Sequence, residues 1–591
     1  MTAPDRIVPA AVTPPQPHRI LVVGGVAAGM GFAARARRLS ENAEIVVLER
    51  DEYVSFANCG LPYHVGGEIA EREKLILHTP ASLAAALRLD VRTGHQVMAV
   101  DAAAHTVTVH RRATGDEIVL PYDALILATG AEPLIPPVPG VDLPVVRTLR
   151  TVPDADALRA LVAAGARQAV VVGAGFIGLE AAEALHQRGL DVTVVELAPQ
   201  VLPPLDPEMA QAVEQSLRTN GVTVHTSTSM TAIHPHPREG SPDAVEVELA
   251  DGTLLPTDLV ILAAGVRPAS HLAATAGADL GPRGHILVDE HLATSTADVY
   301  AVGDAIQVVD AVTGTPTAVP LAGPANRQGR ALADHLLGTG GHRASVLGTA
   351  IVRVFDTVAG TTGRSEKSLK AAGFAHHVLH IHPAHHAGYF PGAQGLHLKL
   401  VFSPDGRVLG AQITGGEGVD KRIDVIATAI RARMNVDDLA DLELAYAPPF
   451  GSAKDPVNMA GFVAQNVLAG LTRLWGPDDL DPILAETATG QHTLLDVRSP
   501  AEFAAGHLPG ALNIAHTALR EHLDEVPTDR PVAVYCASGF RSYLALRVLA
   551  QHGHPNATTL DGGLDTLRHH RPDLPLITGA QDTALLAAAT R

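Results

Sequence analysis

The feature of the sequence that most constrains its fold is a duplicated unit of strand, glycine turn, helix and second strand. The first copy is RILVVGGVAAGMGFAARARRL at Arg19–Leu39, followed by AEIVVLER, and the second is QAVVVGAGFIGLEAAEALHQRG at Gln168–Gly189, followed by DVTVVEL. In such a unit a buried parallel strand leads into a helix whose N-terminal N–H groups and dipole hold a pyrophosphate. Glu49 and Glu196 end the second strands, where a carboxylate accepts the ribose hydroxyls of a dinucleotide. The duplication predicts two dinucleotide sites, one for a cofactor that stays bound and one for a cofactor that exchanges.

The glycine spacing differs between the two copies. The second has a complete G-x-G-x-x-G at Gly173, Gly175 and Gly178, whereas Val26 replaces the middle glycine of the first. One such fingerprint is also compatible with a simple tight turn, but two copies with strand, helix and acid in register predict dinucleotide binding. The residues assigned to the two cofactor sites are Gly24, Gly25, Ala27, Ala28, Gly29, Glu49, Arg50, Thr129, Gly130, Gly173, Gly175, Phe176, Ile177, Gly178, Glu196, Gly265, Gly303, Asp304, Leu321 and Ala322.

One of only two cysteines, Cys59, lies in SFANCGLPYH among Ser, Asn, Gly and Pro. A structural cysteine usually packs as a small hydrophobe, so this polar setting indicates a thiol kept for chemistry, with an inert buried cysteine as the alternative. Reaction requires the thiolate, and an unperturbed thiol with a pKa of about 8.5 is mostly protonated at pH 7. Pro62 suits an early helical position, so we expect a helix N-terminus to lower the pKa of Cys59.

Composition narrows the class of protein. The formal charge of −19, from 44 basic and 63 acidic residues, argues against nucleic acid as the main partner. Two cysteines cannot form a disulfide framework, which favours a reducing compartment. Residues 1–17 hold five prolines and no apolar core, so they predict a disordered tail and not a signal peptide. No stretch near the roughly 18 residues of a membrane span is free of charges or helix breakers, and we expect a cytoplasmic protein.

From about residue 18 to 470 the sequence resembles the FAD-dependent pyridine nucleotide–disulfide oxidoreductases, in the subgroup with a single redox cysteine. The motifs follow that family's order, which implies an FAD-binding domain at 18–149 and 258–344, an NAD(P)-binding domain at 150–257 and a dimerisation domain at 345–470. The resemblance implies tightly bound FAD, with Asp304 in VYAVGDA at its ribityl–phosphate portion, and NADH or NADPH as the exchanging cofactor. No C-x-x-C or C-x₄-C pair is present, so an internal dithiol is excluded.

Within this subgroup, SFANCGLPY and AYAPPFGSAKDPVN resemble coenzyme A–disulfide reductases. The resemblance implies a homodimer in which Tyr446 and Tyr389 of the partner subunit lie beside Cys59. It implies coenzyme A contacts at Gly31, Arg35, Arg38, Ser55, Asn58, Asn326 and Lys454. The phosphates of coenzyme A require basic groups, and Arg35 and Arg38 share a helix face, as a phosphate clamp or simply as a solvated charged face. Relatives use a basic residue at or beside the position that Leu87 occupies in this sequence, with Arg88 next to it. Because of this departure, no coenzyme A contact is assigned at Leu87.

A new α/β pattern begins after a linker predicted at 471–480. HTLLDVRSPAEFAAGHLPGALNI and PVAVYCASGFRS resemble the rhodanese sulfurtransferase domain, which we assign to 481–580. Cys536 ends a buried strand and opens a six-residue loop to Arg541, whose N–H groups and guanidinium would stabilise a thiolate or persulfide. The loop alone is also compatible with a phosphatase. Its length of five residues after the cysteine, together with the upstream segments, favours rhodanese. Asp496 and Arg498 are expected to form a structural pair.

Six histidines gather in HHVLHIHPAHH at 376–386. His380 and His382 share a strand face and are compatible with a metal site. No cysteine or carboxylate joins them in the sequence, so we expect exposed or interface histidines and assign no metal.

The sequence therefore predicts an α/β protein with two Rossmann-like domains, an α+β dimerisation domain and a C-terminal α/β rhodanese domain. The expected function is NAD(P)H-dependent reduction of coenzyme A disulfide, coenzyme A persulfide or polysulfide through Cys59. Alternatives are an NADH oxidase or peroxidase that uses a sulfenic acid, and a sulfur or redox sensor whose rhodanese is a binding module. No basic residue follows Glu196 in Leu197–Pro199, which predicts a preference for NADH.

Overall fold

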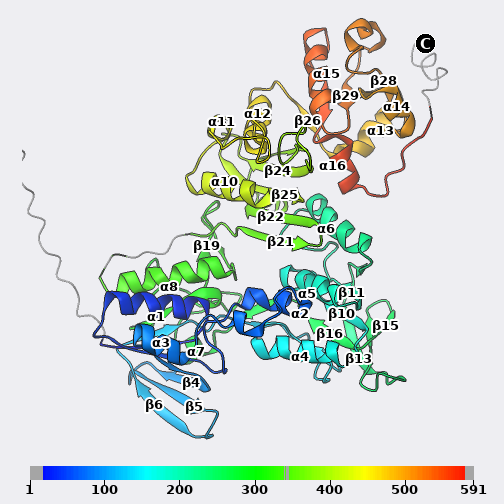
Figure 1. Cartoon of the computed structure of the whole chain (residues 1–591). Helices are drawn as coiled ribbons and strands as arrows, with labels where there is room; N and C mark the ends of the chain where they lie inside the picture. The colour runs from blue at the N-terminus through cyan, green and yellow to red at the C-terminus, as the bar shows by residue number, and fades with distance from the viewer. Residues whose placement is uncertain (1–17, 339, 341–344, 580–591) are drawn as a thin grey trace, which may run out of the picture. The chain divides into compact units, whose positions relative to one another are not determined.

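The computed structural model describes residues 18–338, 340 and 345–579, and the predicted tail at 1–17 lies outside them (Figure 1). The chain forms two compact units, the first comprising residues up to 195 and 229–346, and the second comprising 196–228 and 347 onward. Among the described residues, no helix has the length and apolar character needed to cross a membrane.

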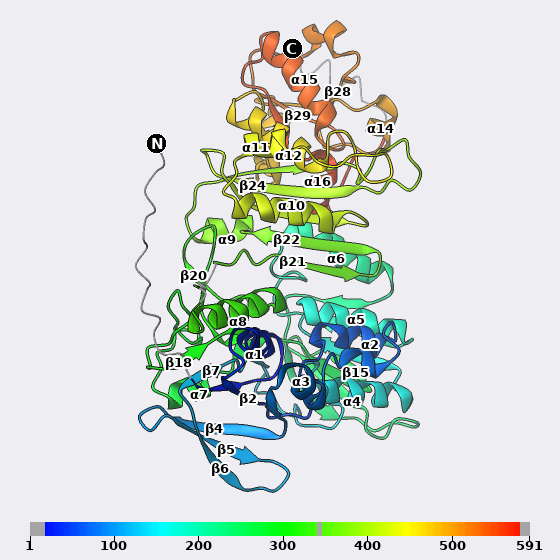
Figure 2. The ribbon, with the colours of Figure 1, turned by 60° about the vertical axis from the view of Figure 1, so that its left-hand side comes forward.

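The first nucleotide fold of unit 1 is a parallel sheet in the order β18-β7-β1-β2-β3. Its strands are β1 (Arg19–Val23), β2 (Glu44–Leu48), β3 (Asp90–Arg92), β7 (Ala124–Leu127) and β18 (Val299–Ala301). Helices α1 (Ala27–Leu39) and α8 (Ala322–Leu336) lie side by side against it (Figure 2). They approach closely because Gly329 of α8 faces α1, where a Cβ would overlap the Ala28 carbonyl oxygen.

The second nucleotide fold of unit 1 has parallel strands in the order β11-β10-β16-β9. These are β9 (Val146–Arg147), β10 (Gln168–Val172), β11 (Asp191–Val195) and β16 (Leu259–Leu262). Helix α5 (Phe176–Gln187) follows β10, and α2 (Leu61–Gly66) packs on it, with Gly66 against Ala184. Helix α4 (Val152–Ala163) holds α2 from another side, since Arg159 Nη1 donates to the His64 carbonyl at 2.6 Å. The helix that follows Cys59 is therefore fixed by both neighbouring helices.

Smaller elements complete unit 1. They are α3 (Pro80–Leu87), α7 (His271–Thr275), the sheet of β4 (His95–Asp101), β5 (Thr106–Arg111) and β6 (Glu117–Pro121), the sheet of β13 (Met230–Pro235), β14 (Val245–Leu249) and β15 (Leu254–Thr257), the pair β8 (Ala131–Pro133) and β17 (Val266–Pro268), and the pair β19 (Val308–Val309) and β20 (Pro316–Thr317).

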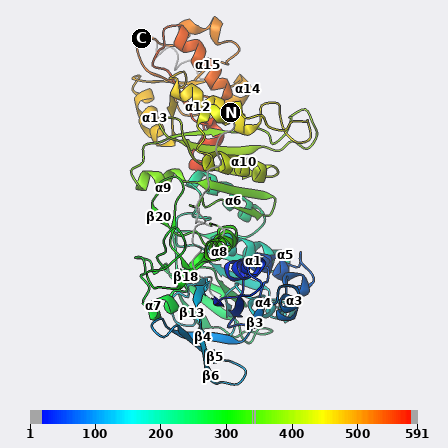
Figure 3. The same cartoon turned by 90° about the vertical axis from the view of Figure 1, so that its left-hand side faces the viewer.

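Unit 2 contains an antiparallel sheet in the order β21-β22-β25-β24-β23. Its strands are β21 (Ala350–Val354), β22 (Thr357–Gly363), β23 (His377–Ile381), β24 (Leu396–Phe402) and β25 (Val408–Gly415). Successive side chains of a strand point to opposite faces. Gly360 accordingly meets Ile423 of α10 (Val419–Arg431), whereas Gln412 bonds to the start of α6 (Pro207–Thr219) (Figure 3). The remaining elements of this part are β12 (Thr223–His225), α9 (Glu366–Ala371), α11 (Val436–Asp441) and α12 (Pro456–Leu468).

The C-terminal part of unit 2 is a parallel sheet in the order β26-β30-β29-β27-β28. The strands are β26 (Leu474–Trp475), β27 (Thr493–Asp496), β28 (Leu512–Asn513), β29 (Val532–Tyr535) and β30 (Thr558–Leu560), with helices α13 (Leu480–Ala488), α14 (Pro500–Ala505), α15 (Phe540–Gln551) and α16 (Gly563–His570). Part of the segment predicted as a linker thus forms β26. Trp475 anchors it, because its buried indole Nε1 donates to the Val534 carbonyl at 3.3 Å. The predicted fold class is confirmed.

Candidate active site

The first glycine turn, between β1 and α1, has the geometry expected of a dinucleotide cradle. Gly24 has φ +109° and a Cβ there would overlap the Ala128 carbonyl oxygen, while a Cβ on Gly29 would overlap the Gly24 carbonyl oxygen. Both positions therefore require glycine. Val26 is accommodated with φ −114° as the residue before the helix. Glu49 is buried after β2 and its Oε2 accepts from the Gly25 N–H at 2.8 Å, which ties the acid to the turn.

The loops after β7 and β18 reach the same edge of this sheet. Gly303 has φ +82°, and a Cβ there would lie 3.0 Å from the Ala28 Cβ at the start of α1. Asp304 follows it, with an oxygen 3.9 Å from Arg150 Nη2, and burial raises the pKa of its carboxyl although Arg150 opposes the shift. Thr129 Oγ1 donates to the Ala269 carbonyl at 2.6 Å, and Gly130 takes φ +67°. Loops from three strands converge where such folds bind nucleotides.

The remaining residues assigned to the first site have simple local roles. Arg50 pairs with Glu132 at 3.2 Å, and Leu321 precedes Ala322, the first residue of α8. Gly265 belongs instead to the second nucleotide fold, where it has φ +106° in the turn after β16. The residues present fit a bound FAD, since the positions nearest the turn exclude side chains and leave backbone N–H groups at the start of α1.

The second glycine turn repeats this geometry between β10 and α5. Gly173 has φ +105° and a Cβ there would overlap the Ala263 carbonyl oxygen, while a Cβ on Gly178 would overlap the Gly173 carbonyl oxygen. Gly175 caps α5, and Phe176 and Ile177 form its first turn. In unit 2, Glu196 follows β11 in the chain and accepts from the Ala198 N–H at 2.8 Å. The glycine turn of unit 1 fits the phosphates of a nicotinamide nucleotide.

Cys59 lies in a single turn of 3₁₀ helix, Asn58–Gly60, directly before α2. Pro62 is in the first turn of α2, as predicted. Asn58 Oδ1 accepts from the Cys59 N–H at 3.1 Å and lies 3.7 Å from Cys59 Sγ. The residue is exposed, so it is not the buried cysteine of the alternative, and its reactivity stays a prediction.

The electrostatic setting of Cys59 differs from the expectation. Although the residue is exposed, partial desolvation of its sulfur raises the pKa of the thiol, and the carboxylates of Glu180 and Asp304 raise it further, whereas the helix N-terminus predicts a lowered pKa. Glu180 projects from α5, a neighbour that the local sequence does not reveal. Tyr63 of α2 donates to Glu180 Oε1 at 3.1 Å, which links this carboxylate to the Cys59 helix. The protein groups alone thus favour a protonated thiol.

Several predicted coenzyme A residues lie together on α1, α8 and the Cys59 segment. A Cβ on Gly31 of α1 would lie 3.3 Å from Asn326 Oδ1 of α8, so these two candidates are in contact. Ser55 has φ +48°, and its N–H donates to the Gly25 carbonyl at 2.8 Å, which fixes the Cys59 segment to the first glycine turn. Left-handed backbone at a non-glycine residue is uncommon and is characteristic of functional segments.

The arginines of α1 have different environments. Arg35 Nε pairs with Asp334 of α8 at 2.5 Å, a partner not predicted from the sequence, and Arg38 is exposed. Arg37 is buried, and its guanidinium donates to carbonyls that include those of Leu87 and Arg88. Arg37 is therefore structural. Because Arg35 is already paired with a carboxylate and Arg38 is exposed, a phosphate clamp of these two residues stays a prediction.

The two predicted tyrosines of unit 2 meet each other. Tyr389 and Tyr446 come from separate loops, their hydroxyl oxygens are 3.0 Å apart, and their exposures are 76% and 48%. Buried Arg422 ties these loops together, with Nη2 bonded to Asp455 Oδ2 at 2.8 Å and to the His385 carbonyl at 2.7 Å. Lys454 is exposed directly before Asp455. The structure thus presents Tyr389, Tyr446 and Lys454 on two connected loops.

Cys536 follows β29 and its side chain is fully buried. The Gly539 N–H donates to Cys536 Sγ at 3.2 Å, and the thiol lies 3.4 Å from Ser542 Oγ. Gly539 has φ +94°, which turns the loop around the sulfur. Arg541 is held by Glu502, with two bonds of 2.7 Å. Of the loop N–H groups predicted to surround the sulfur, that of Gly539 donates to it, and the Arg541 guanidinium binds Glu502; stabilisation of a thiolate or persulfide by this loop stays a prediction.

Glu502 was not predicted. It belongs to SPAEF, where Ser499 and Glu502 form a capping box at the start of α14, and that pattern is its only sequence signal. The bond from Arg541 lowers the pKa of Glu502 to about 2, so this pair stays charged at neutral pH. The predicted pair of Asp496 and Arg498 is buried with a closest distance of 2.6 Å. Arg498 also donates to the Gly506 carbonyl, which supports a structural role.

The histidines at 376–386 differ in part from the expectation. His380, His385 and His386 are buried, so the expectation of exposure is wrong for these three. His382 Nε2 lies 2.8 Å from Thr566 Oγ1 of α16, a contact within the same unit. The expectation that no carboxylate joins them is wrong, because Asp561 and Glu208 both contact His380. These acids are remote in sequence, and only the folded unit brings them to β23.

The family models match most of the described chain. Residues 18–329 match the pyridine nucleotide-disulphide oxidoreductase model, residues 349–456 the dimerisation domain of these oxidoreductases, and residues 479–569 the rhodanese-like domain. An NADH oxidase from Methanocaldococcus jannaschii is 37% identical over 75% of this chain and 97% of its own length. A coenzyme A disulfide reductase from Staphylococcus epidermidis is 33% identical over 76% of this chain and all of its own length.

Two solved structures extend the similarity into the C-terminal domain. The structure of reduced Bacillus anthracis CoADR-RHD is 43% identical, with a TM-score of 0.91, and covers 95% of this chain and 99% of its own. The NAD-dependent persulfide reductase from A. fulgidus is 38% identical, with a TM-score of 0.86, and covers 93% of this chain and 99% of its own.

Proposed function

We propose that this chain, which belongs to the pyridine nucleotide-disulphide oxidoreductase family, reduces coenzyme A disulfide, coenzyme A persulfide or polysulfide with NAD(P)H and FAD, and that its rhodanese domain transfers sulfur. The observation that carries the proposal is the contrast between the two cysteines. Cys59 is exposed on a turn fixed to the first glycine loop, and Cys536 is buried in a loop that donates to its sulfur. One setting suits exchange with a disulfide, and the other suits a carried sulfur atom.

The residues divide the work between binding and chemistry. Gly24, Gly29 and Glu49 would hold FAD, which when bound supplies the electron pair that reduces a disulfide at Cys59. The Cys59 thiolate attacks one sulfur of coenzyme A disulfide, forms a mixed disulfide and releases the other coenzyme A as a thiolate. Tyr389 or Tyr446 of the partner subunit is placed, in this proposal, to give a proton to that leaving thiolate.

The two cysteines can act in sequence through coenzyme A. A persulfide on Cys536 transfers its outer sulfur to the coenzyme A thiol, which regenerates the Cys536 thiol and forms coenzyme A persulfide. Cys59 attacks the outer sulfur of that persulfide and releases coenzyme A, and two electrons and a proton then release hydrosulfide. Because the domains are covalently joined, each site raises the effective concentration of its product at the other. The proposal includes a cytoplasmic location, where the two thiols stay reduced.

The proposed function is tested by steady-state NADH oxidation with coenzyme A disulfide, coenzyme A persulfide and inorganic polysulfide as separate acceptors. We expect rapid turnover with at least one of them, and a higher kcat/KM for NADH than for NADPH because Glu196 repels a 2′-phosphate. Turnover with none of the three would refute the proposal and favour the sensor alternative.

An NADH oxidase is the second candidate, because the M. jannaschii relative carries that name. In that reaction Cys59 would cycle through a sulfenic acid. Oxygen consumption with NADH in the absence of any thiol separates the two functions. Rapid consumption would favour the oxidase, and negligible consumption together with sulfur-dependent turnover would favour the reductase.

Subunit complementation tests whether the active site is shared. The match to a dimerisation domain indicates a homodimer, and Tyr389 and Tyr446 are exposed as residues serving a partner would be. A Cys59→Ser chain and a Tyr389→Phe/Tyr446→Phe chain should each be nearly inactive. After subunit exchange, each mixed dimer should contain one intact site, so a statistical mixture should recover about a quarter of wild-type activity. Absence of recovery, with exchange verified by mass, would contradict a shared site.

A further inference from the structure

We propose that His380 is a positioning residue for the sulfur-carrying loop of Cys536, acting as an imidazolium that bridges Asp561 and Glu208. The inference rests on the sulfurtransferase role proposed for Cys536. His380 lies on β23, outside the rhodanese-like domain, and all the groups involved belong to unit 2.

The segment Asp561–Gly562–Gly563 braces the Cys536 loop from behind. Gly563 has φ +67°, and a Cβ there would lie 2.8 Å from the Cys536 carbonyl oxygen and 2.5 Å from that of Ala537. The N–H groups of Leu564 and Asp565 donate to these two carbonyls at 3.0 and 2.9 Å. Any shift of the bracing segment therefore moves the backbone that carries the reactive sulfur.

His380 holds the other side of the same segment. Its backbone N–H donates to Asp561 Oδ1 at 2.8 Å, and its Nδ1 is 2.7 Å from Asp561 Oδ2. A Cβ on Gly562 would lie 2.8 Å from the His380 Cβ, so the backbone of this segment packs directly on β23. Asp561 is itself buried. His380 thus contacts the brace by two hydrogen bonds and by close packing.

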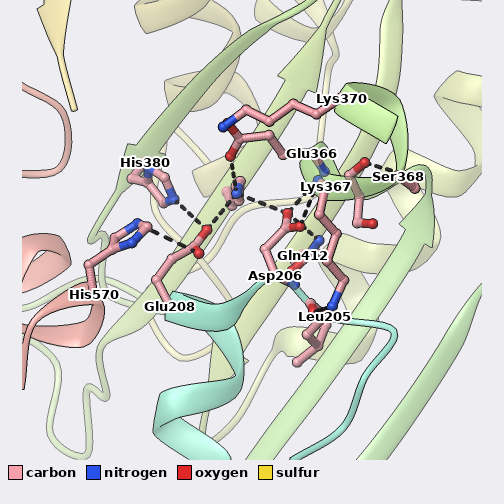
Figure 4. A network of polar contacts seen from close by, with 12 residues as sticks. Leu205, Asp206, Glu208, Glu366, Lys367, Ser368, Lys370, His380, Gln412 and His570 are labelled. Carbon is pink, nitrogen blue, oxygen red and sulfur yellow. Dashed lines mark hydrogen bonds and ion pairs between the residues drawn. The ribbon is translucent and has the colours of Figure 1, made fainter. Parts of the chain in front are cut away.

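The second ring nitrogen of His380 faces another carboxylate. Nε2 is 3.4 Å from Glu208 Oε1 of α6, and Figure 4 shows the ring directed at that side chain. An ionised carboxylate only accepts hydrogen bonds, so a ring between two carboxylates satisfies both as a double donor. The imidazolium is the form that donates from both nitrogens.

The charges around the ring balance in that form. The four acids are Asp206, Glu208, Glu366 and Asp561, and the cations are Lys367, Lys370, Lys399 and protonated His380. Lys399 is fully buried and touches three of the acids, with Glu208 Oε1 at 2.5 Å. Glu208 and His380 also lie with His570 within reach of a common metal ion, but the ammonium of Lys399 already holds the Glu208 oxygen that faces His380.

The other neighbours of the ring favour the same assignment. Burial lowers the pKa of His380, but Asp561 and Glu208 outweigh it and raise the value to about 9. Burial lowers the pKa of the surrounding His382, His397, His569 and His570, so they face His380 as neutral rings. A raised pKa means that the bridge is complete below the ordinary histidine value of 6.5 and is lost as pH rises through about 9.

The test compares sulfur transfer from thiosulfate to cyanide in the full-length FAD-loaded enzyme and its variants. His380→Gln should lower kcat about tenfold, since one buried charged hydrogen-bonded group is removed, with little change in KM. His380→Asn retains a donor near the Nδ1 position and should recover part of the loss. His377→Gln on the exposed part of the same strand is the matched control and should match wild type. NADH oxidation should be unchanged in all three.

Two further readouts separate positioning from a general loss of stability. Amide hydrogen exchange at 561–566 and 536–541 should accelerate by about 10- to 100-fold in His380→Gln, with no change in the nucleotide folds of unit 1. The ratio of the wild-type sulfur-transfer rate to the rate of His380→Gln should fall as pH rises through 9. Asp561→Asn keeps the shape of the side chain that binds His380. It should show the same accelerated amide exchange in the loop as His380→Gln, and a weaker pH dependence of sulfur transfer than wild type.

Wild-type rates and exchange in His380→Gln would overturn the inference. Loss of sulfur transfer on treatment with a chelator, and its return with Zn²⁺, would also overturn the inference. Glu208, His380 and His570 would then bind a metal ion, and His380 would not act as an imidazolium. Failure of wild-type enzyme to transfer sulfur would refute the proposed role of Cys536 instead, and the exchange measurement would still decide whether His380 holds the loop.

Discussion

Cys59→Ser should abolish NADH oxidation with coenzyme A disulfide or persulfide, lowering kcat by a factor on the order of 10³ or more, as for loss of a catalytic nucleophile. Serine keeps nearly the same volume and can still meet Asn58 Oδ1, so the 3₁₀ turn and α2 should remain folded. Its hydroxyl cannot form a disulfide. The only other thiol in the sequence, Cys536, lies in a separate domain with its sulfur enclosed.

Sulfur transfer from thiosulfate to cyanide serves as the internal control for this variant, because it needs Cys536 and no flavin chemistry. That activity should stay within about twofold of wild type, as for a surface change in another domain. FAD content should also be unchanged. Retention of more than a tenth of the reductase activity would show that Cys59 is not the redox thiol.

Cys536→Ala should reduce transfer of sulfur to cyanide by a factor on the order of 10³ or more, since the atom that carries the sulfur is gone. NADH oxidation with preformed coenzyme A persulfide should persist, whereas NADH-dependent release of sulfide from thiosulfate should be lost. The substitution removes one sulfur from a packed site whose loop is also held by Leu564 and Asp565. Cys536→Ser is the matched variant, because it retains a hydrogen-bonding atom near the Gly539 N–H.

The measurement is sulfide produced per NADH oxidised, with each sulfur donor supplied separately. If Cys536→Ala handles every donor as wild type does, the two cysteines do not act in sequence and the rhodanese domain has a sensing or passive role. If the variant also loses reduction of preformed coenzyme A persulfide, the two sites do not divide the reaction as proposed.

Local sequence patterns predicted the main elements well. The glycine turns follow a local pattern, and a Cβ on Gly29 would overlap the carbonyl oxygen of nearby Gly24. A Cβ on Gly24, in contrast, would overlap the carbonyl oxygen of Ala128, which comes from the distant loop after β7. The Cys536 loop is likewise a continuous segment after a buried strand. Tyr389 and Tyr446 were assigned by resemblance, and they meet because Arg422 joins their loops, a contact that no local pattern signals.

The partners that tune the sites could not be predicted, because each arrives from a distant segment. Desolvation of the sulfur raises the pKa of the Cys59 thiol, and Glu180, which comes from the second nucleotide fold, adds to this shift, opposite to the expected direction. Asp334 pairs with Arg35 across almost 300 residues, and Asp561 reaches His380 across 181. A single sequence shows which residues can carry charge, but only packing decides which charges meet.

The anchoring of β26 also gives the protein an intrinsic optical probe. Trp475 is the only tryptophan of the 591 residues, and its indole is buried against β29 with a hydrogen bond to Val534. Emission excited at the red edge of the indole band should therefore report on the rhodanese sheet alone. Titration with denaturant should show a red shift when that sheet opens, while flavin release reports separately on the nucleotide fold. The two signals let the unfolding of each half of the enzyme be followed in one cuvette without any label.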